Sequence, residues 1–191
     1  KHNEAQCFLA VRSGRIVGRI TAVHLRQHHA YHARPLACFG FFECEDDLEA
    51  AHALLDAVRH WVGQRCLNRL RGPFSPSINY QAGLLIDGFD HDTAFLTPYN
   101  PPYYAALLEQ CGLTKAHDLL AFRADRSLLG QALPRLKRVA ERLASRMGAR
   151  IRPLRRWRRG RDLAAFLRIV NASLAAHWGF VPLSGAELEW L

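Results

Sequence analysis

Long apolar runs are absent from this 191-residue sequence, which excludes a membrane-spanning helix as its organising element. A span needs roughly 18 or more apolar residues, and no apolar run in this sequence approaches that length. No apolar leader opens the chain, because Lys1, Glu4 and Gln6 interrupt its first ten residues. We therefore expect a cytoplasmic protein with no membrane partner. The first residue is Lys1 rather than Met, so we also expect a processed or partly observed product.

Paired cysteines are also lacking. The five cysteines are an odd, scattered set without a CxxC pair. Such a set favours reduced thiols in the cytoplasm over a disulfide framework.

A histidine cluster offers the one pattern suited to a metal. His24, His28 and His32 are spaced by four, and on a helix they would share a face suited to zinc. No Cys or carboxylate lies within that run, and it directly follows a predicted strand. We therefore interpret these residues as exposed loop histidines and expect no metal site.

Acidic residues are scarce between residues 123 and 162, where three Asp or Glu stand against 14 Lys or Arg. This segment carries a net charge of +11, and the whole chain carries +9. A basic stripe around an aromatic residue, here Trp157, is one way to engage nucleic-acid phosphates. A solvated linker that pairs with acids elsewhere is the other interpretation. Because no nucleic-acid motif accompanies the charge, we do not favour nucleic acid as the partner.

The rest of the sequence has an ordinary globular composition, with 49% hydrophobic and 23% charged residues. Apolar runs predict strands at 8–11 and 16–23, joined by the hairpin dipeptide Ser13-Gly14, and a central strand at 36–42. Apolar residues every three or four positions predict a helix over 48–62, capped by Asp46 or Asp47. The polar, His-rich segment 25–35 predicts a loop. Short strands are predicted at 69–71 and 118–124, with a helix at 103–110 between them.

In the C-terminal third, the spacing of apolar residues predicts helices at 133–147 and 161–175, a short strand at 150–154 and a turn at 178–182. Ser184 and Glu187 form a capping-box pattern for a last helix that we expect to be cut at Leu191. If Leu191 is a natural end, the apolar faces of 166–174 and 188–190 would need a partner such as a second copy, giving a homodimer.

The stretch from Arg71 to Gly112 contains most of the candidate site residues. Pro, Gly and Asn residues keep it irregular until Pro101 or Pro102 can open a helix. A loop of this length inside a compact domain usually has a function or lines a cleft.

Several motifs together resemble a known superfamily. They are Phe8-Leu-Ala-Val-Arg-Ser-Gly, Phe39-Gly-Phe-Phe-Glu, Arg71-Gly-Pro-Phe, Tyr99-Asn-Pro-Pro-Tyr-Tyr and Trp178-Gly-Phe-Val-Pro-Leu. They resemble a group of bacterial proteins with two GNAT (GCN5-related N-acetyltransferase)-like halves. The resemblance implies an α/β, layered α+β fold with a mixed central sheet flanked by helices. It also implies a first half at 1–126 without its first strand and helices, a basic linker helix at 127–148, and the start of a second unit at 149–191.

The resemblance further implies acyl transfer from acetyl-CoA or another acyl-CoA to a small-molecule or peptide amine. The pantetheine of the coenzyme would lie between the splayed strands at 36–42 and 69–71, so Phe41, Phe42, Gly72 and Phe74 are the candidate cofactor-binding residues. The sequence departs from the family where the pyrophosphate should dock. Glu43, Glu45, Asp46, Asp47 and Glu49 replace the glycine-rich turn at that helix N-terminus. These acids cap the helix and repel a pyrophosphate.

Two residues are candidate catalytic groups. Glu43 ends the central strand, where the family often places a general base; its alternative role is helix capping. The family's general-acid tyrosine would fall at Leu108, so Tyr103, about one turn earlier, is the candidate substitute. The candidate substrate-binding residues lie in the central loop: Ser75, Ser77, Asn79, Tyr99, Asn100 and Tyr104. Their alternative roles are turn hydrogen bonding and packing.

Two functions follow from these observations. The first is a GNAT-like N-acyltransferase whose first half is an acceptor cleft or a degenerate half, so that this chain alone would be inactive. The alternative is a non-catalytic binding or scaffold module that uses the Arg-rich segment 135–161 for a polyanion or a partner protein.

Overall fold

The computed structural model describes residues 3–148, 152, 153 and 155–190. The chain divides into two compact units. Unit 1 comprises residues 1–116 and 167–191, and unit 2 comprises residues 117–166. The boundaries predicted at 126 and 148 stay predictions, because grouping by contacts does not test where a repeated half begins.

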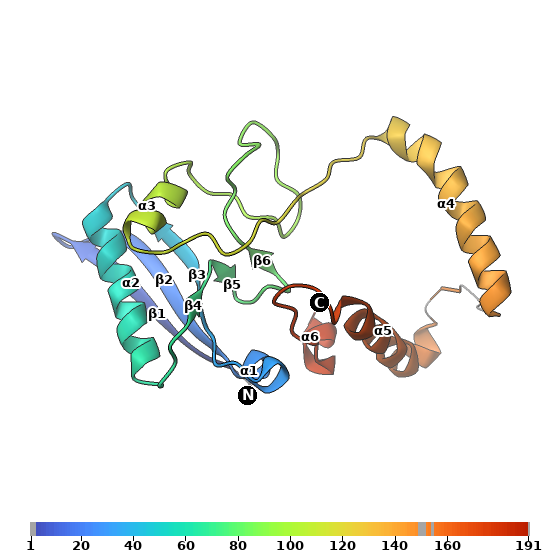
Figure 1. Cartoon of the computed structure of the whole chain (residues 1–191), viewed down its shortest axis with the longest axis horizontal. Coiled ribbons are helices and arrows are strands. Elements are labelled where there is room, and N and C mark those ends of the chain that lie inside the picture. Colours follow the sequence, from blue (N-terminus) through green and yellow to red (C-terminus); the bar gives the residue numbers. More distant parts are fainter. Residues whose placement is uncertain (1–2, 149–151, 154, 191) are drawn as a thin grey trace. The chain divides into compact units, whose positions relative to one another are not determined.

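Unit 1 is built on a four-stranded mixed sheet in the order β1-β2-β3-β4 (Figure 1). β1 (Asn3–Arg12), β2 (Arg15–Leu25) and β3 (Ala37–Cys44) pair antiparallel in succession, and β4 (Leu70–Arg71) pairs parallel to β3. Ser13 and Gly14 turn the first hairpin with φ of 50° and 78°, as the Ser-Gly dipeptide predicted. The expected layered α/β class is confirmed.

The helix α2 (Leu48–Gly63) covers one face of this sheet (Figure 1). The Asp47 side chain accepts a hydrogen bond from the Ala50 N–H at 3.1 Å and caps the helix. Leu54, Leu55 and Val58 are almost fully buried against the sheet. The predicted helix and its cap are therefore confirmed, and the apolar residues spaced by three and four form its buried face.

Two predictions of local structure are wrong. The segment 25–35, predicted as a loop, contains α1 (Arg26–His32), which ends at Ala33 with a left-handed φ of 51°. His28 is the buried residue of this helix. Because a histidine takes the buried position, the sequence lacks the apolar pattern by which a helix is predicted. The segment 118–124, predicted as a strand, has no regular structure and is exposed. Its apolar side chains have no strand edge to pair with in the described structure.

The C-terminal part of unit 1 packs on the face of the sheet opposite α2. The second core cluster combines Val23, Cys38 and Phe74, and Trp178 packs against it. His32 Nε2 lies 2.7 Å from the carbonyl oxygen of Phe180, which is itself buried. α6 (Gly185–Trp190) begins with the predicted capping box, because the Glu187 N–H donates to Ser184 Oγ at 3.3 Å and the Ser184 N–H donates to Glu187 Oε2 at 2.8 Å.

Unit 2 contains α4 (Arg126–Met147), a short 3₁₀ turn η1 (Arg156–Arg158) and the first half of α5 (Arg159–Leu174). Arg152 holds Asp162 through two bonds of 2.6 and 2.7 Å. These bonds, with the Arg155 N–H, hold the pKa of Asp162 well below its usual range. Helices were predicted at 133–147 and 161–175, and the structure confirms both. Most of the strand predicted at 150–154 lies outside the described residues.

None of the helices in the described ranges combines the length and apolar composition that crossing a bilayer requires.

Candidate functional site

The site begins where the backbone of β5 (Phe74–Ser75) crosses β3 at Gly40. A Cβ atom at Gly40 would lie 1.7 Å from the carbonyl oxygen of Phe74, so only glycine allows this approach. β3 pairs with β4 only at Ala37 and Cys38, and beyond that the next strand, β5, pairs with β6 (Gln81–Ala82) instead. The parallel pairing of β3 and β4 therefore ends after two residue pairs, and the last residues of β3 border an opening.

A bulge in β3 widens the same opening. Between the pairs Thr21–Gly40 and Arg19–Glu43, β3 has one residue more than β2. Phe41 adopts a left-handed φ of 48° there, and its N–H donates to Ser75 Oγ at 2.9 Å rather than to a strand carbonyl. A bulge of this kind redirects side chains at a sheet edge.

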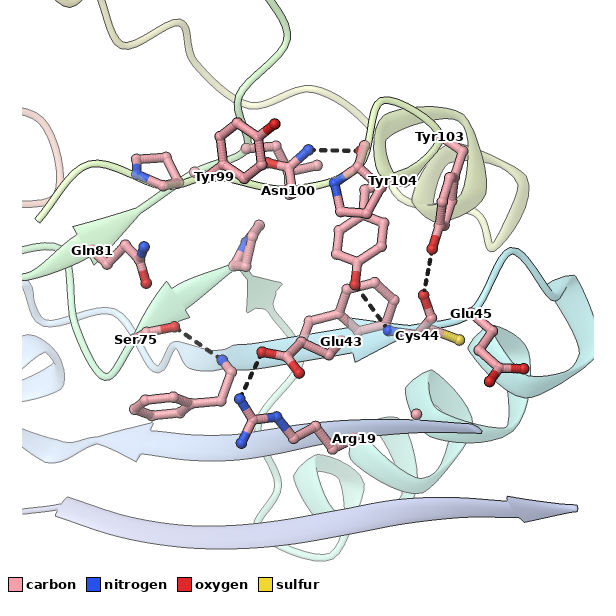
Figure 2. Close-up of a pocket in the computed structure, with 18 of the residues that line it drawn as sticks. Arg19, Glu43, Cys44, Glu45, Ser75, Gln81, Tyr99, Asn100, Tyr103 and Tyr104 are labelled. Carbon is pink, nitrogen blue, oxygen red and sulfur yellow. Dashed lines mark hydrogen bonds and ion pairs between the residues drawn. The ribbon is translucent and has the colours of Figure 1, made fainter. Parts of the chain in front are cut away.

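These features border an open cavity of about 600 Å³ within unit 1 (Figure 2). Its base is formed by the first residues of β2 and the last residues of β3. The central loop and the start of α3 (Tyr104–Gln110) form the other side. The polar and charged lining side chains are Arg19, Glu43, Glu45, Ser75, Gln81, Tyr99, Asn100, Tyr103 and Tyr104. The charged lining residues are Arg19, Glu43 and Glu45, and Glu45 is paired with Arg15, which lies outside the lining.

Glu43 places its carboxylate in this cavity. One of its oxygens lies 2.7 Å from Arg19 on the neighbouring strand, and both side chains are more than half exposed (Figure 2). An exposed pair of this kind contributes at most about 1 kcal/mol to stability. Its main consequence is orientation, because Arg19 fixes one carboxylate oxygen and leaves the other able to accept from a ligand.

The tyrosines Tyr103 and Tyr104 both reach the backbone of Cys44 (Figure 2). The Tyr103 hydroxyl donates to the Cys44 carbonyl oxygen at 2.9 Å, and the Cys44 N–H donates to the Tyr104 oxygen at 3.0 Å. Burial raises the pKa of both hydroxyls, so both are protonated at neutral pH. Because the Tyr104 oxygen already accepts the N–H, its own hydrogen is available to donate to another group, and Tyr104 lines the cavity.

The structure brings most of the predicted site residues together. Glu43, Tyr103, Ser75, Tyr99, Asn100, Tyr104, Phe41 and Phe42 all line the cavity. Within it, Asn100 has a structural role, because it is buried and bonds the backbone of Leu85 at 2.7 and 3.2 Å. The Tyr104 ring also packs edge-on against Phe42 at 5.1 Å, so it contributes to packing as well as to the cavity wall.

Four predicted site residues lie outside the cavity lining. Ser77 Oγ accepts from the Asn79 N–H in a turn, and the Asn79 amide donates to the Val181 carbonyl at 3.0 Å. Gly72 lies against the Phe39 backbone, where a Cβ would come within 2.4 Å of its carbonyl oxygen. Phe74 is buried in the second core cluster. Each of these four residues therefore makes a structural contact in unit 1, and only for Ser77 and Asn79 had hydrogen bonding to the backbone been given as the alternative role.

The acidic turn after β3 is paired with arginines of the first hairpin. Glu45 receives two bonds from Arg15, at 2.7 and 2.8 Å. Arg12 pairs with Asp47 and also with Glu49, the latter at 2.6 Å. The Ala50 N–H and Arg12 together lower the pKa of Asp47.

Because Asp47 already caps α2, a pyrophosphate would have to displace a carboxylate held by both a helix N–H and an arginine. The residues of this turn therefore do not fit the phosphates of coenzyme A.

Arg19 and Gln81 line the cavity and were not predicted. Arg19 lies directly opposite Glu43 in the strand register, and the Gln81 side chain donates to the Thr97 carbonyl at 3.1 Å. Arg19 and Glu43 carry opposite charges, which is typical of a cross-strand pair. The sequence predicts that they face each other only if the bulge in β3 is located first.

The predicted histidine pattern does not form a metal centre. His28 and His32 stack with ring centroids 4.3 Å apart on α1, whereas His24 belongs to β2. Within the described ranges, no three His, Cys, Asp or Glu side chains are grouped so as to hold a metal ion.

The fold and the cavity define an α/β protein with a ligand-sized opening between the sheet strands β2 and β3 and the central loop. No protein-family model matches the chain, and no solved structure matches it. Two curated proteins are similar to it. YghO of Escherichia coli strain K12 is 34% identical over 182 residues, and a bacterial ceramide synthase of Caulobacter vibrioides is 34% identical over 193 residues. These matches cover 95% and 100% of this chain but 46% and 49% of the relatives, so the chain spans about half the length of the curated relatives it matches.

Proposed function

We propose that this chain is the acceptor-binding part of a GNAT-like acyltransferase that joins an acyl group to an amine. One relative is named as a ceramide synthase, and a ceramide is an amide of a long-chain amino alcohol. The motifs that resemble two-half GNAT-like proteins support the same class of reaction. A longer protein would supply the acyl donor site, because the relatives extend well beyond the matched residues.

The observation that carries this proposal is the chemistry of the cavity lining. An amine is a cation at neutral pH, and the Glu43 oxygen that does not contact Arg19 favours it over an anion. The unpaired side of Glu43 can accept a hydrogen bond from the amine nitrogen. The Tyr104 hydroxyl can donate to an oxygen of the same ligand, such as the hydroxyl of an amino alcohol.

The rim of the cavity favours an acceptor with an apolar chain. Ile16 and Phe41 line the cavity and are 59% and 42% exposed. Val11 lies directly opposite Ile16 on β1 and is 59% exposed. An alkyl chain that covers these side chains would remove apolar area from water, which contributes about 25 cal/mol per Å².

The paired acidic turn limits what this chain can do alone. Its residues do not fit the coenzyme phosphates, so the acyl-CoA site is assigned to the part of the longer protein outside this chain. We expect this chain to bind an amine and to form no amide when an acyl-CoA is added. Amide formation by the 191-residue chain would contradict this division of roles.

The binding test is calorimetric titration of a primary amine with about eight carbons into the chain. Glu43→Gln removes the carboxylate and is expected to weaken binding by about ten-fold or more, since a hydrogen bond to a charged group contributes about 1.5–3 kcal/mol. Glu49→Gln is the matched control, because Glu49 belongs to the same acidic turn but lies outside the cavity lining. No binding, or an equal loss in both variants, would refute the proposed acceptor site.

A further inference from the structure

The helix α4 exposes a continuous apolar stripe. None of its residues is buried. The large apolar side chains are between 44% and 77% exposed: Leu128, Leu129, Leu133, Leu136, Val139, Leu143 and Met147. They follow one another at spacings of one, three and four residues, which places them on one side of a helix. Leu128 and Val139 make this stripe broader than the seam of a coiled coil, which uses only two positions in every seven residues.

Cations border this stripe on both sides. α4 contains six Lys or Arg residues and one acid, Glu141. At about 100° per residue, Arg135, Arg142 and Arg146 fall along one edge of the stripe and Lys137 falls along the other. Long basic side chains can extend along an apolar surface while their charged ends remain in a polar layer.

The rest of unit 2 gives the stripe no apolar core. Among residues 117–166 whose exposure the structure describes, Asp162 alone is buried. Trp157 in η1 is 70% exposed, with the guanidinium groups of Arg155 and Arg158 at 5.5 and 4.5 Å from its ring. In addition to the stripe, the same unit therefore presents an exposed aromatic ring with two cations beside it.

We propose that α4 binds the surface of an anionic lipid bilayer, with its apolar stripe in the interface and its flanking cations on the headgroup phosphates. An anionic bilayer complements both properties of the helix at once. A nucleic acid would complement the charge but leave the stripe in water. A second copy would cover the stripe but bring like charges together. This is binding to a surface, which needs no spanning helix, and it does not depend on the proposed acyltransferase function.

The test is co-flotation of the chain with vesicles of phosphatidylcholine alone and vesicles that also contain phosphatidylglycerol. Binding is expected to the anionic vesicles and to fall steeply with salt. The variant Leu136→Gln with Leu143→Gln keeps the charge and removes two large side chains of the stripe. It is expected to weaken binding by about ten-fold or more. Ser127→Gln with Ser145→Gln changes the opposite face and is the matched control.

Four results would overturn the proposal. One is equal binding to both kinds of vesicle. The second is an RNA or DNA complex that the stripe variant leaves intact, without vesicle binding. The third is concentration-dependent self-association that the stripe variant abolishes, again without vesicle binding. The fourth is loss of vesicle binding in a longer natural product, which would show that its additional residues cover the stripe. The amine titration uses different variants, so its failure would be distinguishable from these results.

Discussion

The buried histidine His28 predicts a specific loss of stability on mild acidification. Its ring is 7% exposed and stacks on His32, and its Nδ1 atom has no hydrogen-bond partner among the described residues. Burial, followed by the positive charge of His32 and Arg71, lowers the pKa of His28 from 6.5 to about 4. Since the unfolded chain takes up the proton first, folding stability is complete above about pH 6.5 and is lost as the pH falls toward 4.

The magnitude follows from the two pKa values. A difference of about 2.5 pH units corresponds to roughly 3 kcal/mol in full, of which about 2 kcal/mol is lost between pH 7.5 and pH 5. Carboxylates with normal or lowered pKa values change little over that range, so the histidines dominate it.

Urea unfolding at pH 7.5 and pH 5 measures this loss directly. We expect the parent chain to lose about 2 kcal/mol more than His28→Phe, which keeps a ring at the site but cannot take up a proton. His29→Gln on the same helix is the control, because His29 is exposed, and it should behave like the parent. Equal losses in the parent and in His28→Phe would refute the reasoning, because the buried imidazole would then not be the titrating group.

Two further predictions concern packing. Gly40→Ala should lower the free energy of unfolding by at least about 2 kcal/mol, since the new Cβ meets the β5 backbone. In the same urea assay, Gly63→Ala at the end of α2 should be neutral or stabilising, because its new Cβ meets no atom within 4 Å. Similar midpoints for the two variants would contradict the strand crossing. A thiol reagent should react quickly with Cys7 and Cys66, which are exposed, and with the other three cysteines only after unfolding. Rapid reaction of all five would contradict the packing of unit 1.

Much of unit 1 could be predicted because its apolar residues recur with the spacing that is typical of a strand or a helix. The hairpin, the central strand and α2 each carry a regular apolar pattern with a turn or cap residue at the end. α1 could not be predicted, because its buried position is filled by His28 rather than by an apolar residue. The segment 118–124 has the short apolar run of a strand but no neighbouring strand among the described residues, and a run of apolar residues alone does not supply one.

The candidate site could be predicted only in part. Glu43 and Tyr104 were found because one ends the central strand and the other follows the prolines that start α3. Arg19 was not found because its place opposite Glu43 depends on the bulge at Phe41, which the sequence does not reveal. Contacts made across the fold, such as Asn79 to Val181, also depend on tertiary structure and were not predictable from local pattern.

The two charged regions of unit 1 can be compared by the kind of ligand each could accept. At the turn before α2, Arg12 pairs with Asp47 and Glu49 and Arg15 pairs with Glu45, and Asp47 occupies the helix N-terminus, so this turn does not attract a phosphate. In the cavity, Arg19 pairs with one oxygen of Glu43, and the other oxygen is left to accept a hydrogen bond from a cation. Had this half evolved to hold an acyl-CoA by its phosphates, the free N–H groups and excess positive charge should lie at that turn. The arrangement instead favours an amine at the second oxygen of Glu43. The Glu43→Gln and Glu49→Gln variants separate this contact from the general charge of the acidic turn.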